Sequence, residues 1–422
     1  MASTGRLVLI PLESRWGRLV VLGMTVVAAT WLGGIILRPA VAEYRAAHAT
    51  TVEALERALA WDPQNPALHL GLGGLYESLA QYDRARAQYD MAHKLRPTDA
   101  HPWLRLALLA DHQGRRSEAH EALDAALRSD PHNVGVRWEA ALLAYQWGER
   151  ARALEHLRYV LAVDPAQRDA AFQLARVLLE PEEDPSRLLP SEPDGLSNIL
   201  VAAVSHEDLP LAEAAWTRRA SLAPPLPEQI GRGYLQLLLD HGQGRVAREV
   251  WRTLQADRTS RADANAVWNG GFEADQILGW GLDWRVQRMW GVDVTLDRFV
   301  AARGKHSLRL TFNSFPTLDF GGVWQLVPVE PGREYRLRAL AKATDFTTRS
   351  GLKLQAVLPD SDAVIAQTNA IAGSTDDWVP LEALVRIPPE ASLIRLRLRR
   401  EPSPGPDGNL GGKVWVDEVR LE

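Results

Sequence analysis

The 422-residue sequence contains no cysteine, which excludes disulfide bridges, thiolate zinc sites and thiol nucleophiles. Neither sign of charge dominates, because 48 lysines and arginines stand against 53 acids, and this balance excludes a chain-wide binder of nucleic acid. Methionine and phenylalanine are scarce, at four and seven, whereas tryptophan occurs fifteen times. The indole ring both fills cores and forms flat binding surfaces. The length predicts two or three domains rather than one core.

An uncharged apolar segment lies near the N-terminus. Residues 19–37 carry no charge over nineteen positions, about the length of helix that crosses a bilayer. The arginines before the segment predict that residues 1–18 stay in the cytoplasm and that the rest is exported. We therefore expect a single-pass protein of a bacterial inner membrane, with its bulk in the periplasm. The alternative is a signal peptide cleaved after Ala42, which ends a small-x-small sequence.

Proline recurs every 34 residues, at Pro63, Pro97, Pro131 and Pro165. Small and large apolar residues at matching positions between these prolines predict pairs of closely packed helices, each pair ended by a proline. This pattern resembles the tetratricopeptide repeat family, whose tryptophan position is filled here by Trp103. The resemblance implies an all-α solenoid over residues 43–260, with degenerate repeats at its C-terminal end.

The family's superhelix lines its concave face with fixed positions of each first helix. At these positions the sequence has an apolar strip, which implies docking of a helix or an extended peptide of an envelope protein. The alternative is that the chain's own later helices cover the strip. The side chains with which this family clamps a peptide carboxylate are missing. The predicted partner-groove residues are Leu70, Leu104, Leu108, Trp138, Leu142, Tyr145 and Phe172.

The hydrophobic period changes from helical to alternating after residue 264. Between Leu393 and Arg399, leucine or isoleucine alternates with arginine, as expected when one strand face meets a core and the other meets water. Short strands bounded by glycine, proline, asparagine and aspartate predict an all-β domain over residues 265–422. Their number and spacing favour a two-sheet sandwich of jelly-roll type.

Two motifs delimit this domain, Asn269-Gly270-Gly271-Phe272-Glu273 at its start and Trp415-Val416-Asp417-Glu418-Val419 at its end. With them the domain resembles the jelly-roll carbohydrate-binding modules that accompany xylanases and glucanases. The resemblance implies a structural calcium ion that ties the first strand to the last through Glu273 and Asp417, since calcium prefers carboxylate oxygens. The alternative is two solvated acids at strand edges. No other cofactor is expected.

Sugar binding needs a flat aromatic ring under the apolar face of a pyranose and polar side chains around its hydroxyl groups. The candidates are Trp284, Trp290 and Trp324, with Gln325 as the polar partner. The alternative for each tryptophan is a place in the core or an anchor for a loop.

The sequence has no glycine-rich phosphate loop, no HExxH pair and no GxSxG elbow, so we expect no enzyme activity. We expect a membrane-anchored periplasmic scaffold for exopolysaccharide or surface polysaccharide assembly or export. Its repeats would recruit envelope proteins or peptides, and its sandwich would contact polysaccharide. The alternative is a purely protein-binding adaptor for envelope or secretion-machinery assembly, whose sandwich serves as a spacer or a second docking face.

Overall fold

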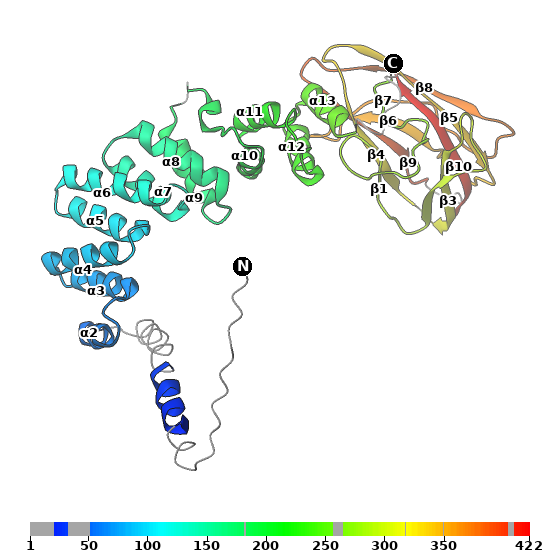
Figure 1. Cartoon of the computed structure of the whole chain (residues 1–422). Coiled ribbons are helices and arrows are strands. Elements are labelled where there is room, and N and C mark those ends of the chain that lie inside the picture. The colour runs from blue at the N-terminus through cyan, green and yellow to red at the C-terminus, as the bar shows by residue number, and fades with distance from the viewer. Residues whose placement is uncertain are drawn as a thin grey trace, which may run out of the picture. The chain divides into compact units, whose positions relative to one another are not determined.

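The structure is a computed structural model that describes residues 21–32, 51–180, 183–255, 265–316, 318–348, 350–403 and 409–422. Its contacts divide the chain into two compact units, Met1–Glu183 and Asp184–Glu422. Helical repeats come first and a sandwich of two antiparallel sheets follows, which confirms this part of the predicted fold (Figure 1). The segment 1–18, predicted to be cytoplasmic, lies outside the described residues.

A helix over residues 21–32 has only exposed side chains. The predicted membrane segment 19–37 extends past this helix at both ends, into residues that lie outside the described ranges. In the described ranges, no helix has both the length and the apolar character needed for a bilayer crossing.

The first unit is built from antiparallel helix pairs that follow the 34-residue period (Figure 1). Helix α3 packs on α4, α5 on α6 and α7 on α8, and successive pairs meet through α4 with α5 and through α6 with α7. The helices are α2 (Val52–Trp61), α3 (Pro66–Ser78), α4 (Tyr82–Leu95), α5 (Ala100–His112), α6 (Arg116–Ser129), α7 (Val134–Gln146), α8 (Arg150–Val163) and α9 (Arg168–Leu178).

Side-chain caps fix where the first helix of each pair begins. Asn65, Asp99 and Asn133 follow the recurring prolines by two residues, and each accepts a hydrogen bond of 3.0–3.1 Å from a backbone N–H in the first turn. Such caps satisfy donors that the helix itself leaves without acceptors. The proline two residues earlier cannot continue the preceding helix, so one short motif both ends a helix and starts the next.

A glycine sets the close approach of α3 and α4. A Cβ atom on Gly73 would lie 2.4 Å from the ring of Tyr89, which is fully buried. The Tyr89 hydroxyl donates a 2.5 Å hydrogen bond to Glu77 on α3, and burial together with this carboxylate raises the pKa of Tyr89. The repeat's small residue at this position is therefore a packing requirement.

The second unit begins with helices. Helix α10 packs on α11, α12 packs on α13, and α13 contacts strand β4 of the sandwich. The turn before α13 also touches the sandwich, because the Ser392 hydroxyl donates to the Gly242 carbonyl and accepts from the Gly244 N–H at 3.4 Å. The elements are η1 (Pro185–Leu188), α10 (Pro193–Ser205), α11 (Leu209–Arg219), α12 (Glu228–Asp240) and α13 (Gly244–Leu254).

The sandwich has two five-stranded sheets, in the orders β1-β4-β9-β6-β7 and β2-β3-β10-β5-β8, and all its strand pairs are antiparallel. The strands are β1 (Arg285–Val286), β2 (Val292–Asp297), β3 (Ser307–Pro316), β4 (Phe320–Pro328), β5 (Glu334–Thr344), β6 (Lys353–Val357), β7 (Val364–Gln367), β8 (Val379–Arg386), β9 (Leu393–Arg400) and β10 (Asn409–Leu421). Strands β1, β2 and β7 are not evident from the sequence pattern, since β1 and β7 are short and β2 is an edge strand.

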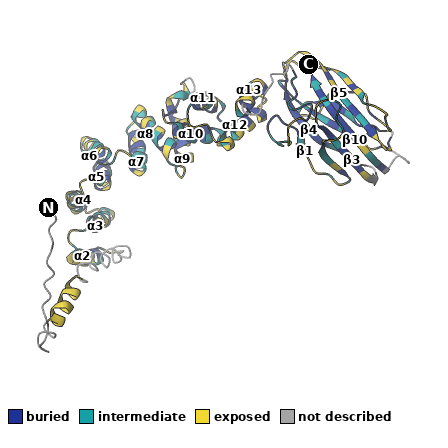
Figure 2. Ribbon diagram, turned by 45° about the vertical axis from the view of Figure 1, so that its right-hand side comes forward, coloured by how far each residue is buried: buried dark blue, intermediate teal, exposed yellow. Residues whose placement is uncertain are grey.

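One continuous apolar core fills the space between the two sheets. Figure 2 shows buried residues along the strands of both sheets. Leu396 and Leu398 of β9 face this core from one sheet, and Val414 and Val416 of β10 face it from the other. Because side chains alternate along a strand, the residues between them point away from the core.

Candidate functional site

Polar side chains cover the outer face of the β1-β4-β9-β6-β7 sheet. We call this surface the arginine face. Its floor is formed by strand residues whose neighbours in the chain point into the core. A surface of this kind offers many hydrogen-bond donors and acceptors in one plane, which suits a polar ligand. The arginine face consists of Arg285, Trp324, Lys353, Gln367, Arg395, Arg397 and Arg399, and the buried Gln355 lies beneath it.

The alternating sequence of β9 produces the central row of this face. Ile394, Leu396 and Leu398 are fully buried in the core, so the three arginines between and after them emerge on the other side. Their side chains lie flat, with exposures of 27%, 16% and 21% for Arg395, Arg397 and Arg399. The sequence predicts that these residues point away from the core. It does not predict that side chains of neighbouring strands cover most of their surface.

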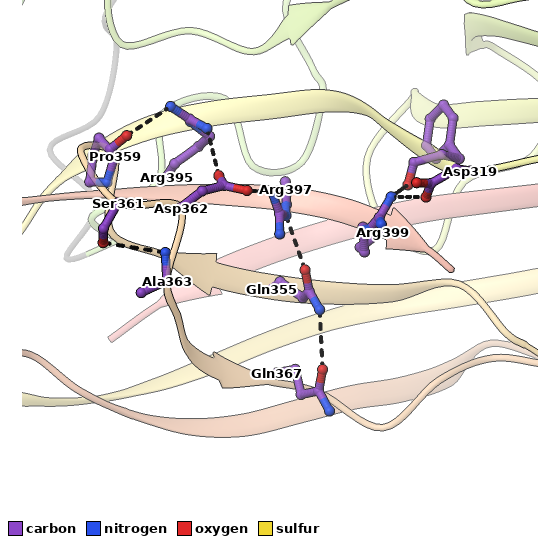
Figure 3. Close-up of polar contacts among 11 residues, drawn as sticks. Asp319, Gln355, Pro359, Ser361, Asp362, Ala363, Gln367, Arg395, Arg397 and Arg399 are labelled. Carbon is purple, nitrogen blue, oxygen red and sulfur yellow. Dashed lines mark hydrogen bonds and ion pairs between the residues drawn. The ribbon is translucent and has the colours of Figure 1, made fainter. Parts of the chain in front are cut away.

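A hydrogen-bonded chain crosses the face from β9 to β7 (Figure 3). The Nε of Arg397 donates to Gln355 at 3.0 Å, and the Gln355 amide donates to Gln367 at 3.2 Å. The Asp362 carboxylate, in the turn after β6, accepts from Arg395 at 3.0 Å and from Arg397 at 2.7 Å. The hydrogen bond from Arg397 keeps the pKa of Asp362 below its usual value. These contacts hold the guanidinium planes in fixed positions.

Two further ion pairs border the row. Arg399 donates to the Asp319 carboxylate and, at 3.1 Å, to the Phe320 carbonyl (Figure 3). Lys353 of β6 pairs with Glu401 at 3.0 Å. Asp319 and Glu401 are about half exposed, whereas the cations beneath them are largely covered. The acids therefore sit at the rim of the face and the cations form its floor.

Trp324, predicted to stack on a sugar, instead stacks on guanidinium groups. Arg285 and Arg395 lie over its ring, at 4.6 Å and 5.2 Å from the centroid. Burial lowers the pKa of Arg285, and the cation–π contact offsets part of that cost. The ring is half-buried, so the protein's own cations occupy the place predicted for a pyranose.

The other three glycan candidates differ in how far they are exposed to solvent. Trp290 is 89% exposed, in the loop after β1, which is an edge strand of the same sheet. Trp284 is 0% exposed and its Nε1 donates to the Asn269 carbonyl, so its prediction as a sugar platform is wrong. Gln325 is also fully buried, where its amide bonds both backbone groups of Trp268. Its prediction is wrong for the same reason, because a buried side chain cannot meet a ligand.

The loop that carries Trp290 adjoins the arginine face. The Gln287 N–H donates to the Gly322 carbonyl at 2.7 Å, and the Met289 sulfur lies beside Gly322. The adjacent Gly321 lies beside the Arg399 side chain. The exposed Trp290 therefore follows a segment that contacts the β4 glycines next to Arg399.

The predicted calcium ligands bind backbone N–H groups of one loop. Glu273 accepts from the N–H groups of Lys305 and His306 at 2.8 Å and 3.0 Å. Asp417 is fully buried, accepts from Ala302 and Arg303, and has its pKa raised by burial. The two acids thus join the start and the end of the domain through the same loop. Among the described residues no group of three or more His, Asp or Glu could hold a metal ion. The calcium ion stays a prediction.

The predicted partner-groove residues of the first unit divide into two groups. Leu104 and Phe172 are buried, with 8% and 3% exposure, so their prediction as groove lining is wrong: they fill the space between helices. The others are accessible, with Tyr145 exposed and the rest half-buried. They come from the first helices of three successive pairs, α3, α5 and α7. The accessible strip consists of Leu70, Leu108, Trp138, Leu142 and Tyr145.

A polar pocket that the repeat pattern does not predict lies in the first unit. It has a volume of about 410 Å³ and opens between α3, α4 and α5. The rings of Tyr82 and His112 face each other across 5.5 Å at its wall. The lining carries charges of both signs, from Glu77 and Arg105. Its lining residues are Gly74, Glu77, Ser78, Tyr82, Arg105 and His112.

Residues 40–109 match the family model of the tetratricopeptide repeat, which confirms the repeats predicted from the 34-residue period. Over 106 residues, 25% of this chain, the sequence is 29% identical to the human General transcription factor 3C polypeptide 3 and covers 12% of it. Over 112 residues, 26% of this chain, it is 29% identical to the Peroxisomal targeting signal receptor of Candida glabrata and covers 19% of it. The chain thus spans less than a fifth of each of these curated relatives.

Solved structures match each kind of fold. The CBM22-1 xylan-binding domain of Paenibacillus barcinonensis Xyn10C is 21% identical, with a TM-score of 0.28, over 36% of this chain and 90% of that one. Yeast Tom70 is 20% identical, with a TM-score of 0.29, over 50% of this chain and 39% of that one.

Proposed function

We propose that this chain is a non-catalytic scaffold that recruits a protein partner through its repeats and contacts glycan through its sandwich. The observation that carries the proposal is the arginine face, a row of fixed guanidinium groups, together with the exposed Trp290 in the loop after β1, the edge strand of the same sheet. Hydroxyl groups of a sugar pair with such donors and acceptors, and an exposed indole stacks on the apolar face of a pyranose.

The accessible strip of the first unit supports the recruitment of a protein. Leu108, Leu142 and Tyr145 lie on consecutive first helices, so a helix or extended peptide could contact all three. Tyr145 is 46% exposed and offers both an apolar ring and a hydroxyl group. The expected partners are envelope proteins or peptides.

The proposed place of action is the periplasmic side of a bacterial inner membrane. The apolar segment 19–37 and the arginines ahead of it support this, because cytoplasmic flanks are rich in positive charge. A membrane-anchored scaffold that holds both proteins and polymer suits the assembly or export of an exopolysaccharide or a surface polysaccharide. The membrane segment would keep both binding surfaces near the machinery that makes the polymer.

Affinity electrophoresis tests the glycan contact. The full chain is run through native gels that contain xylan, β-glucan or polygalacturonate, and through a gel without polysaccharide. We expect retardation in at least one polysaccharide gel, and we expect Trp290→Ala to reduce it. Trp61→Ala, which removes an exposed tryptophan of α2 in the first unit, is the matched control and should be retarded like the wild type. Unaltered mobility of the wild type in every gel would reject the glycan contact.

One observation favours the alternative of a purely protein-binding adaptor. Phe299 is 96% exposed in the loop after β2, and the loop is firmly held, because Asp297 accepts from the N–H of Phe299 and of Val300. An exposed phenylalanine presents an apolar ring that a protein partner would cover, so it is the docking residue of this alternative. Under this alternative, Phe299→Ala abolishes the capture of an envelope protein, whereas Trp290→Ala leaves every assay unchanged.

A further inference from the structure

Three guanidinium groups stand in a row along β9. Arg395, Arg397 and Arg399 occupy alternate positions and therefore emerge on one side of the strand, about 7 Å apart. Cations at this distance repel each other, and the repulsion is strongest where the groups are partly removed from water. Such a row is stable only when carboxylates lie close to it.

The protein places one carboxylate between the first two arginines. Asp362 reaches Arg395 with one oxygen and Arg397 with the other, at 3.0 Å and 2.7 Å (Figure 3). This arrangement shows that the interval between neighbouring arginines of the row accepts a carboxylate that bridges both. Bridging hydrogen bonds between a carboxylate and guanidinium groups are strong and directional.

The second interval of the row, between Arg397 and Arg399, has the same length, but among the described residues it holds no bridging carboxylate. Asp319 pairs with Arg399 only, and Arg397 uses its Nε for Gln355 and its Nη1 for Asp362. In the part of the chain that the structure describes, no carboxylate bridges Arg397 and Arg399. The interval thus offers a second bridging position, and the Arg399 side chain at its end lies beside Gly321 of β4.

The face as a whole has more cations than acids. Five cations lie on it, and four acids pair with them or lie close to them, which leaves one positive charge in excess. At neutral pH the arginines and the lysine are protonated and the acids are ionised, so the excess is present there. The cations are Arg285, Lys353, Arg395, Arg397 and Arg399, and the acids are Asp240, Asp319, Asp362 and Glu401.

We propose that the arginine face binds an acidic polysaccharide, with a uronate carboxylate lying between Arg397 and Arg399. The ligand carboxylate repeats the contact that Asp362 makes one interval away and balances the excess charge. A neighbouring sugar of the same polymer reaches Trp290 at the edge of the face. This inference rests on the proposed glycan contact and specifies its chemical class.

Polygalacturonate and its fully methyl-esterified form are the probes, because they share one backbone and differ only in the free carboxylate. Affinity electrophoresis of the full chain should show retardation by the acid and little by the ester. Removing one guanidinium from the bridging position should weaken retention by the acid roughly tenfold to a hundredfold. The variants are Arg397→Gln and Arg399→Gln.

Arg338→Gln is the matched control, since Arg338 is paired with Glu382 on the other sheet of the sandwich. It should be retained like the wild type. Thermal midpoints establish that the variants are folded, and Arg399→Gln serves if Arg397→Gln fails to fold.

Three outcomes overturn the inference. Equal retention on the ester, or wild-type retention of both face variants on the acid, excludes a bridging carboxylate and leaves the glycan contact standing. Retention only on neutral xylan or β-glucan does the same. The absence of retention on the acid, the ester and the neutral polymers instead rejects the proposed function itself.

Discussion

The indole of Trp251 stands edge-on to the indole of Trp280, with ring centroids 4.8 Å apart and planes at 75°. Trp251 belongs to α13, whereas Trp280 belongs to the segment that leads into β1 of the sandwich. A second edge contact, at 5.4 Å, joins Trp251 to Trp268, and a Cβ on Gly281 would lie 2.4 Å from the Trp251 ring. Trp251 therefore packs α13 against the β-domain, in addition to the contacts of Ser392 with the turn before this helix. These contacts agree with the place of α13 in the same compact unit as the sandwich.

Replacing Trp251 by alanine should destabilise the second unit by about 3–5 kcal/mol, because the ring is 1% exposed and its loss leaves a cavity. Urea titration of the full chain, followed by near-ultraviolet circular dichroism, measures this change. Trp290→Ala is the control and should alter the free energy of unfolding by no more than about 0.5 kcal/mol, since that ring is exposed.

A truncated chain also tests whether the contacts of Trp251 stabilise the sandwich, and it leaves no cavity in α13. Residues 265–422 alone should unfold at a lower urea concentration than residues 184–422, because they lack α12 and α13. Equal midpoints for the two chains would show that the contacts of Trp251 contribute nothing to the stability of the sandwich.

Two neighbouring glycines of α3 should respond in opposite ways to alanine. Gly73→Ala places a Cβ against the buried Tyr89 ring and should cost about 1–3 kcal/mol through overpacking. Gly74→Ala meets no atom closer than 4.0 Å and should stabilise α3 by about 0.5–1 kcal/mol, since alanine favours a helix. Hydrogen exchange of peptides from α3 and α4 measures both. Equal effects of the two substitutions would contradict the close packing of Gly73 on Tyr89.

The sequence predicts local structure well because its signals are periodic. The prolines at 34-residue intervals predict the helix pairs, and the alternation in β9 correctly separates Leu396 and Leu398 from the arginines. The caps at Asn65, Asp99 and Asn133 repeat with the same period and are recognisable in the same way. Each of these features depends on residues close together in the chain.

The candidate site is less predictable because its partners are distant in the chain. Asp362 is 33 residues from Arg395, and Asp319 is 80 residues from Arg399, so neither pairing follows from spacing. Trp284 and Trp290 lie six residues apart, yet one is fully buried and the other almost fully exposed. Which indole faces water depends on the packing of the sheets, and only the structure shows it.

The loop over residues 302–306 should depend on the carboxylate of Asp417. In Asp417→Asn, an amide NH₂ group replaces one carboxylate oxygen, so at least one of the backbone N–H groups of Ala302, Arg303 and Glu418 loses its acceptor. The loss should destabilise the second unit by about 1–3 kcal/mol, measurable as a lower thermal midpoint. Asp360→Asn, which changes an exposed acid, should leave the midpoint unchanged.

Calcium titration tests the predicted ion at Glu273 and Asp417. A cation offsets the cost of a charged, buried Asp417, so millimolar calcium should raise the thermal midpoint of the wild type more than magnesium does. The difference between the two ions should vanish in Asp417→Asn. An identical response of the wild type to both ions would reject the calcium site and leave the acids as acceptors for the loop.

Acid should weaken the first unit through His156. This side chain is 4% exposed on α8, its Nδ1 accepts from Arg137 at 3.3 Å, and burial lowers its pKa to about 4. Since the unfolded chain binds the proton near pH 6.5 and the folded chain only near pH 4, stability falls as the pH drops between these values. From pH 7 to pH 5 the loss should be about 2 kcal/mol. Hydrogen exchange of peptides from α7 and α8, corrected for intrinsic rates, measures this loss.

His156→Gln should remove most of this pH dependence, whereas His132→Gln, which changes an exposed histidine, should keep it. A wild type equally protected at both pH values would show that His156 takes up its proton without cost in the folded state.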